Sequence, residues 1–441
     1  MLLEWFLSVV YPVRRGVHVC GSNNNTNNTN GSGRVLTWGN VPLDKVKEGL
    51  TTFFVPTKRG EAVREQLVFY NPAMRNNRDL TLVAIAAFSS TTSKTLTFLD
   101  LMSGTGVRSI RLLKEVGDFN LIINDKNVFS YFLIVKNLLH NFPLEKKLVC
   151  NGVHLFCFKG LEIRVYNLDA NHLMSKLVYE EQIRPEVIDL DPFGSPAPYV
   201  ENCLKTVNPR GGLIGITATD TPALCGVYPD ACKRKYGAKP ARTEYCHEVG
   251  LRILIGSVAS LGAKHGVGVF PLVSFAEKHY MRTIVRTEKN EKKAKLALKR
   301  LGYLFYCPRC MWRETSETLC MGSVCLCGKP VEVAGPLWLG GLHNQSFCDQ
   351  MLRVVDRVET PVTPRLAKLL KLLREEASTK TNCYCYDIHT LSKSFGCSAP
   401  GTSWVIAKLR EIGYEATRTH LGGTKILTNA PIAALKKILI Q

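Results

Sequence analysis

Short apolar runs that each lead to a carboxylate constrain the fold of this chain more than any other feature. Such runs, rich in leucine and β-branched residues, lead to Asp100, Asp125, Asp169 and Asp191. Runs of this length predict buried strands, and helical segments are expected between them. Alternating strands and helices are typical of a mostly parallel, doubly wound sheet, which places its functional groups at the carboxyl ends of the strands. The sequence therefore predicts an α/β fold with four acids at one edge of the sheet.

A glycine-containing turn follows the first of these strands. The strand expected at 96–100 leads into Ser103-Gly104-Thr105-Gly106, and a helix is expected after the turn. Small residues in such a turn let a ligand approach the backbone, and the start of the helix offers unpaired N–H groups. Asp125 follows about 20 residues later, where an acid is placed to accept hydrogen bonds from ribose hydroxyls. These features favour a nucleotide-like cofactor at this turn.

The segment Asp189-Leu190-Asp191-Pro192-Phe193-Gly194 closes the fourth strand. Asp191 offers a proton acceptor and Phe193 an aromatic face, which suit the flat, weakly nucleophilic amino group of a nucleobase. The alternative is an Asp-Pro turn that only closes a strand, with Phe193 as a core aromatic. The cofactor turn earlier in the chain favours the functional interpretation.

The charge of the chain indicates a polyanionic partner. It carries 57 Lys and Arg against 37 Asp and Glu, a net charge of +20 over 441 residues. Nucleic acid is favoured over an anionic membrane because no basic amphipathic anchor stands out. The 16 cysteines are scattered over a long chain without a secretory signal, so reduced thiols are expected in an intracellular compartment, the nucleus or the cytoplasm, with an organelle left open. The apolar run at 2–10 is too short to span a bilayer, so no membrane association is expected.

Composition also divides the chain into three parts. Residues 1–40 contain an Asn/Thr/Gly/Ser-rich run and are expected to be a poorly ordered tail. Residues 41–287 are expected to form the domain that holds the sheet, which ends in a β-hairpin. Residues 288–441 are expected to form a second, α+β domain that begins with a Lys-rich helix, either a solvated face or a phosphate contact.

The second domain contains two cysteine pairs and a helical end. Cys307 and Cys310 have the spacing of a zinc knuckle, whereas Cys325 and Cys327 are one residue closer, and Cys320 lies between the pairs. Thiolates from two such turns suit a tetrahedral structural zinc, and the alternative is reduced, unliganded cysteine. Helices are expected at 363–377, 387–395 and 402–412, followed by strands at 415–419 and 425–428. Three helices and a hairpin resemble a winged helix, a common nucleic-acid-binding unit.

Several motifs, in the same order, resemble the tRNA guanine-26 dimethyltransferase family of class I S-adenosylmethionine-dependent methyltransferases. The resemblance covers roughly residues 46–441 and rests on Phe69-Tyr70-Asn71-Pro72, Asn77-Arg78-Asp79, residues 100–108, residues 189–196, Thr217-Ala218-Thr219-Asp220, Leu224-Cys225-Gly226, residues 246–250, Gly335-Pro336-Leu337-Trp338 and residues 413–420. It implies a Rossmann-like sheet and a tRNA-binding C-terminal domain. The activity it implies is transfer of two methyl groups, one after the other, to the 2-amino group of guanosine 26 in tRNA.

The resemblance also assigns roles to residues of this chain. Asp191 would bind the guanine amino group and accept its proton, and Phe193 would stack on the base. The residues implied for S-adenosylmethionine are Arg78, Asp100, Gly104, Arg108, Asp125, Asp169 and Ala170. The implied zinc ligands are Cys307, Cys310, Cys325 and Cys327, with Cys320 as the spare cysteine. A monomer is expected.

Two other functions stay open at this point. Asp-Pro-aromatic turns also occur in amino-methyltransferases that act on adenine or cytosine in RNA or DNA. A catalytically idle RNA-binding module could keep the same fold as a scaffold. The presence of Asp100, Gly104, Gly106 and Asp125 argues against the idle module, because the cofactor turn would be expected to erode in it.

Overall fold

The computed structural model describes most of the chain from the first expected strand onward. The described residues are 36–38, 41–57, 67–150, 153–277, 279–319, 324–355, 363–379 and 384–440. Within the expected tail, Leu36–Trp38 forms β1, which pairs with β2, and the rest of that tail lies outside the described residues. No helix in the described ranges is long and apolar enough to cross a membrane.

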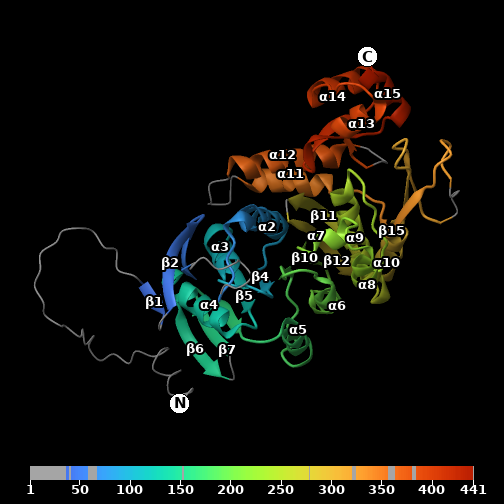
Figure 1. The fold of residues 1–441 in the computed structure, drawn as a ribbon. Coiled ribbons are helices and arrows are strands. Elements are labelled where there is room, and N and C mark those ends of the chain that lie inside the picture. Colours follow the sequence, from blue (N-terminus) through green and yellow to red (C-terminus); the bar gives the residue numbers. More distant parts are fainter. Residues whose placement is uncertain are drawn as a thin grey trace, which may run out of the picture.

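A nine-stranded sheet forms the centre of the molecule (Figure 1). Parallel strands lie in the order β8-β5-β4-β9-β10, so the chain moves outward from β4 to β8 and then returns to β9. This places a topological switch point between β4 and β9. Antiparallel β12 and β11 extend one edge, and β7 and β6 extend the other. The bounds are β4 Leu96–Asp100, β5 Phe119–Asn124, β6 Glu145–Cys150, β7 Val153–Phe158, β8 Leu161–Tyr166, β9 Val187–Leu190, β10 Gly212–Ala218, β11 Val267–Glu277 and β12 Tyr280–Lys289.

Helices cover both faces of this sheet and bury its apolar side chains. One face packs against α2, α3 and α4, and the other packs against α5, α6 and α9. The expected doubly wound α/β fold is confirmed, and the strands expected at 96–100 and 187–190 have the bounds of β4 and β9. The bounds of the helices are α2 Arg75–Ser89, α3 Val107–Glu115, α4 Val128–Asn141, α5 Ala170–Tyr179, α6 Ala197–Thr206, α7 Thr221–Leu224, α8 Pro229–Tyr236 and α9 Cys246–Lys264.

A hairpin that precedes the sheet is joined to it by buried charges. It consists of β2 (Val41–Glu48) and β3 (Thr51–Pro56). Glu48, the last residue of β2, is 1% exposed and binds guanidinium groups of α2 and α3. Burial raises the pKa of Glu48, but the hydrogen bonds and charges of Arg78 and Arg111 lower it to about 2. The carboxylate is therefore ionised at neutral pH and holds the hairpin against both helices.

The C-terminal part contains two further three-stranded sheets. After α10 (Glu291–Leu298), the strands β13 (Leu301–Tyr306), β14 (Arg313–Ser316) and β15 (Glu332–Trp338) pack beside α9. Helices α11 (Gln345–Val354) and α12 (Pro364–Ser378) pack on α2 and lie between the central sheet and the C-terminal end of the chain (Figure 1).

The chain ends in the expected winged-helix arrangement. Its elements are β16 (Tyr386–Asp387), α13 (Ile388–Phe395), α14 (Thr402–Glu411), β17 (Ala416–Thr419), β18 (Gly422–Thr428) and α15 (Ile432–Ile440). The three strands lie in the order β16-β18-β17. The three expected helices and the two expected strands are confirmed, whereas β16 and α15 were not foreseen. A two-residue strand leaves too short a pattern to recognise in a sequence.

Candidate active site

A buried arginine lies where the switch point brings three carboxylates together. Arg108, in the first turn of α3, is 5% exposed. Its Nη2 binds Asp191, and its Nε lies 3.1 Å from Oδ2 of Asp189. Its Nη1 donates to Asn77 at 3.2 Å and to Thr81 at 3.1 Å. Burial lowers the pKa of Arg108, but the surrounding carboxylates raise it above its ordinary value, so the guanidinium stays charged.

Asp100 and Asp189 face each other on neighbouring strands beside this arginine. The two residues are register partners in β4 and β9, and both are almost fully buried. Burial and the nearby Asp189 raise the pKa of Asp100 to about 7, although Arg108 and a hydrogen bond from Ser109 lower it. Asp100 therefore binds a proton more readily than an exposed aspartate does. Asp189 has a second cation, because Arg282 of β12 also binds its Oδ1.

Asp191 differs from these two acids because it reaches the surface. Its side chain is 20% exposed, and its Oδ2 binds Arg108. Among the described residues, no donor hydrogen-bonds to its Oδ1. Phe193 is 66% exposed and packs edge-on against Phe69, with ring centroids 4.4 Å apart. The site thus presents a carboxylate oxygen and an aromatic ring side by side in the sequence, and both are open to a ligand.

The turn that carries both groups is fixed by the next strand. Gly194 adopts a left-handed conformation with φ of +80°, which favours glycine. Its N–H donates to Oγ1 of Thr219 at 2.7 Å, and its carbonyl accepts from the N–H of Thr219 at 2.9 Å. The turn after β9 is therefore anchored to the end of β10.

The glycine turn after β4 is held by the acid predicted for the ribose. The backbone N–H of Gly104 donates to Oδ2 of Asp125 at 2.9 Å, and Oδ1 accepts from the N–H of Asn127. Burial raises the pKa of Asp125 despite these two hydrogen bonds. Gly104 has φ of +56°, and a Cβ there would lie 2.8 Å from the carbonyl oxygen of Phe69. The close approach of two backbone segments thus explains the glycine at this position.

The other residues predicted for the cofactor lie in two places. Asp169 is exposed and caps α5 by accepting from Asn171, and Ala170 beside it is buried. Both lie at the carboxyl end of β8, on the same edge as Asp125. Arg78, in contrast, is buried and donates from Nε and Nη2 to Glu48 at 2.7 and 2.6 Å. The structure therefore ties Arg78 to the hairpin, as it ties Arg108 to Asp189 and Asp191.

The four cysteines of the two pairs converge on one point. Sγ of Cys307 lies 3.5 Å from Sγ of Cys327, and the same distance separates Cys310 and Cys325. All four sulfur atoms lie within 4.8 Å of one another. Tetrahedral zinc with Zn–S bonds of roughly 2.3 Å requires this kind of spacing. Cys320, the expected spare, lies outside the described residues.

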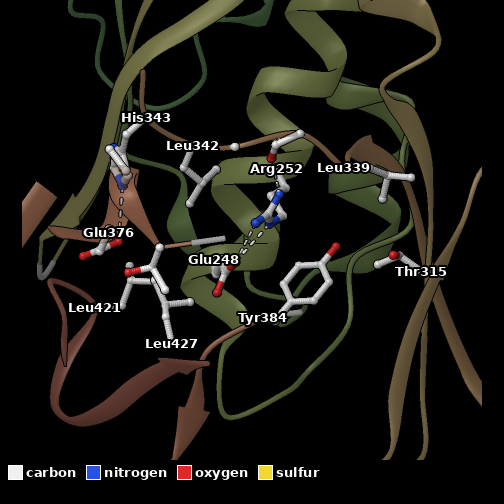
Figure 2. A pocket seen from close by; sticks show the side chains of 14 residues that line it. Glu248, Arg252, Thr315, Leu339, Leu342, His343, Glu376, Tyr384, Leu421 and Leu427 are labelled. Atoms are coloured by element: carbon white, nitrogen blue, oxygen red, sulfur yellow. Dashed lines mark hydrogen bonds and ion pairs between the residues drawn. The ribbon is translucent and has the colours of Figure 1, made fainter. Parts of the chain in front are cut away.

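A small cavity away from the sheet edge is not the active site. Glu248 and Arg252 of α9 line one side of it, and His343 and Glu376 line another side, as Figure 2 shows. Its volume is about 110 Å³, which suits a few water molecules. None of the residues predicted for catalysis or for the cofactor lines it.

The charged centre of the site consists of Arg108, Asp100, Asp189 and Asp191. Sequence reasoning missed three side chains around it. Asn77 and Thr217 were recognised only as parts of motifs, and Arg282 was assigned no role. Arg282 is fully buried and donates to Thr217 at 2.7 Å as well as binding Asp189. An arginine inside the apolar strand of residues 280–289 was an available signal, because a buried charge requires a partner.

Comparisons with known proteins support the fold and indicate a family. The model of the N2,N2-dimethylguanosine tRNA methyltransferase family matches residues 49–440. A tRNA (guanine(26)-N(2))-dimethyltransferase of Methanobrevibacter smithii is 34% identical over 401 residues, covering 90% of this chain and 97% of that protein. One from Pyrococcus furiosus is 36% identical over 401 residues, covering 90% and 99%. The structure of Trm1 from Pyrococcus horikoshii with S-adenosyl-L-methionine has a TM-score of 0.79 and 32% identity, covering 90% of this chain and 99% of that chain.

The burial of the two acids predicts different effects of neutralising them. Asp189→Asn leaves Arg282 and Arg108 without full compensation inside the protein, so we expect a loss of about 3 kcal/mol in the free energy of unfolding. Asp191→Asn should cost about 1 kcal/mol or less, because water reaches this side chain. Urea denaturation of both variants measures the difference. Equal losses would contradict the assignment of Asp189 as the buried partner of the two arginines.

Proposed function

The chain belongs to the N2,N2-dimethylguanosine tRNA methyltransferase family, and we propose that it methylates the 2-amino group of guanosine 26 in tRNA twice, with S-adenosylmethionine as the donor. The observation that carries the mechanism is the partly exposed carboxylate of Asp191, held by Arg108, two residues before the exposed ring of Phe193. Guanine offers a flat ring and an exocyclic amino group, which match these two features.

We propose that Asp191 binds the amino group and takes its proton. The lone pair of this nitrogen is delocalised into the purine, so the nitrogen attacks poorly until a carboxylate orients it. As the new N–C bond forms, the bond between the methyl group and sulfur breaks, with S-adenosylhomocysteine as the leaving group. The nitrogen becomes acidic, and its proton passes to Oδ1 of Asp191 and then to water. Arg108 fixes the carboxylate through Oδ2, so that Oδ1 stays directed to the substrate. The second methyl transfer repeats these steps on the nitrogen that carries one methyl group.

The residues at the carboxyl ends of β4, β5 and β8 fit the methyl donor. When bound, S-adenosylmethionine supplies a methyl group already activated on a positive sulfur, so in-line positioning provides much of the acceleration. We propose that Asp125 accepts hydrogen bonds from the ribose hydroxyls, because a backbone N–H orients each of its carboxylate oxygens. Gly104 lets the turn pass close to the backbone of Phe69 and donates its N–H to Asp125, and Asp169 with Ala170 would contact the adenine.

We propose supporting roles for the remaining residues that the resemblance assigns to the cofactor. Asp100 shares the charged centre with Arg108 and accepts from Ser109 at 2.7 Å, so it shapes the floor of the turn. Arg78 holds the N-terminal hairpin through Glu48. Asp100 and Arg78 would then contribute to cofactor binding indirectly, because they fix the positions of the glycine turn and of α3.

The C-terminal part, residues 288–441, is proposed to bind tRNA. A winged helix provides a common nucleic-acid-binding unit, and the net charge of +20 provides attraction to phosphates. We propose a monomer that works in the nucleus or the cytoplasm, with an organelle left open. Light scattering of the purified protein tests the monomer.

The first activity prediction concerns the proton acceptor. Asp191→Ala should lower methyl transfer by about 10²–10⁴-fold, because both orientation of the amine and acceptance of its proton are lost. Labelled S-adenosylmethionine, unmodified tRNA and nucleoside analysis measure dimethylguanosine. Asp230→Asn, an exposed acid in α8, is the control and should keep full activity.

The same experiment separates the alternatives. Label on adenine or cytosine would favour an amino-methyltransferase of another specificity. Absence of transfer by the unmodified protein would favour the idle RNA-binding module. Full activity of Asp191→Ala would refute the proposed proton acceptor.

A second prediction concerns the exposed ring. Phe193→Ala should lower kcat/KM for tRNA by about 10–100-fold, since stacking on a base contributes roughly 1–3 kcal/mol. Phe193→Tyr keeps a ring and should retain most of the activity. Tyr179→Ala removes another exposed aromatic, 77% accessible, and should change nothing. Equal activity of Phe193→Ala and Tyr179→Ala would contradict the stacking role.

A third prediction concerns the four cysteines, which we propose hold a structural zinc. The purified protein should contain about one zinc ion per chain, because four convergent thiolates fill a tetrahedral site. Cys310→Ser should lose the metal, whereas Cys397→Ser, a half-buried cysteine after α13, should retain it. Mass spectrometry of the metal content decides between zinc and reduced cysteines.

A further inference from the structure

A second cavity lies at the same edge of the sheet as the candidate active site. β11 pairs antiparallel to β12, and β12 pairs antiparallel to β10. Strand β11 therefore runs parallel to β10 and ends at the edge of the sheet that carries Asp191, the catalytic edge. The last residues of β11, including Glu277, line a cavity of about 450 Å³. Helix α12 forms another wall, and the turn between β17 and β18 closes the side towards the winged helix. The cavity therefore lies between the catalytic edge and the proposed tRNA-binding part.

Two short connections join this cavity to the charged centre. Oε2 of Glu277 accepts from the hydroxyl of Tyr280 at 2.9 Å and from Nδ2 of Asn76 at 2.9 Å. Burial raises the pKa of Tyr280, Arg282 lowers it, and the charge of Asp191 adds to the rise. Asn77, the neighbour of Asn76, accepts from Arg108. Asn76, which lines the cavity, is thus the chain neighbour of a residue that binds Arg108.

The lining combines the chemical groups that a nucleotide requires. Lys368 of α12 is exposed, and no acid in the described ranges pairs with it, so it can meet a phosphate. Leu369 and Leu372 supply an apolar wall for the face of a base. Asn76 supplies an amide whose Oδ1 has no hydrogen-bond partner among the described residues. A volume of about 450 Å³ has room for a base and its sugar.

Methylation of a base within tRNA creates a need for such a cavity. The target guanosine must leave its stack to reach Asp191 and Phe193, and its removal unstacks the adjoining nucleotide. A second cavity beside the first would hold that nucleotide and offset part of the unstacking cost. Because α12 and the turn after β17 help to form it, the cavity is complete only where the catalytic edge meets the C-terminal part.

We propose that this cavity binds the nucleotide adjacent to the target guanosine, with Lys368 on its phosphate and Leu372 against its base. The inference rests on the proposed function, since it names a second contact with the same substrate. It assigns part of the tRNA specificity to α12, outside the sheet that carries the chemistry.

The phosphate contact is tested by two matched variants of α12. Lys368→Ala should weaken tRNA binding several-fold and lower the slope of log K against log salt concentration by about 1. Lys371→Ala removes the same charge from an exposed position of the same helix that does not line the cavity, and should leave both quantities unchanged. Equal effects of the two variants would overturn the proposed contact. Binding is measured with S-adenosylhomocysteine present, so no turnover occurs.

The base contact is tested by combining a cavity-filling variant with abasic tRNA. Leu372→Trp should weaken binding of intact tRNA about 10-fold, but should have little effect on tRNA that lacks the base on one side of guanosine 26. Such non-additivity is expected only when the two changes act on one contact. Two abasic tRNAs are compared, one for each neighbour of guanosine 26. The proposal is overturned if Leu372→Trp weakens binding of intact tRNA and of both abasic tRNAs equally, or if it does not weaken binding of intact tRNA.

A failure of this cavity proposal can be distinguished from a failure of the proposed function. Absence of dimethylguanosine with the unmodified enzyme would refute the activity, whereas the binding experiments judge the cavity without any turnover. An unchanged dissociation constant for S-adenosylmethionine shows that each variant is folded. If Leu372→Trp does not fold, the two lysine variants decide the proposal.

Discussion

The buried charge of Arg108 is the constraint on which the arrangement of the site depends. A guanidinium that is 5% exposed is tolerated only where anions and hydrogen-bond acceptors surround it. The end of β9 provides the carboxylates of Asp189 and Asp191, and α2 provides further acceptors. The same contacts fix α3, whose first residues follow the cofactor turn. The position of the turn and the orientation of Asp191 therefore have one physical cause.

The carboxylates around this arginine differ in how deeply they are buried. Asp189 is 1% exposed and binds two guanidinium groups, so its charge is fully compensated and unavailable to a substrate. Burial and the neighbouring Asp189 raise the pKa of Asp100, and Arg108 offsets only part of this rise. Asp191 shares the same cation but lies at the rim. Among the described residues, no donor hydrogen-bonds to its Oδ1, which is the property that the proposed proton acceptor needs.

The strand ends were predictable from the sequence, but the ion pairs were not. Apolar runs before Asp100, Asp125, Asp169 and Asp191 placed all four acids at one edge, because parallel strands share the direction of the chain. The pairing of Asp189 with Arg108 joins strand β9 to helix α3 across 81 residues of sequence. Long-range contacts of this kind follow from strand order, and hydrophobic periodicity does not determine strand order.

The residues around Glu48 and the cavity beside α12 illustrate the same limit. Glu48 meets Arg111 across 63 residues. The cavity joins β11 to a helix that begins at Pro364. Each segment has a recognisable pattern by itself, so the sequence predicted the winged-helix strands and α12. Their position against the sheet is decided by tertiary packing, which a local pattern does not contain.

A buried glutamate explains how the C-terminal part keeps its place at the catalytic edge. Glu376 of α12 accepts from His420 at 2.7 Å and contacts His343 at 3.2 Å. Burial raises the pKa of Glu376, but His420 and the hydrogen bonds of both histidines hold it well below its ordinary value. His420 precedes β18, and its Nε2 accepts from the N–H of Ala276 in β11. One carboxylate thus connects α12 and the winged helix to the strand that ends at the second cavity. A tRNA bound by the C-terminal part would therefore meet the catalytic edge at a distance that protein packing has already fixed.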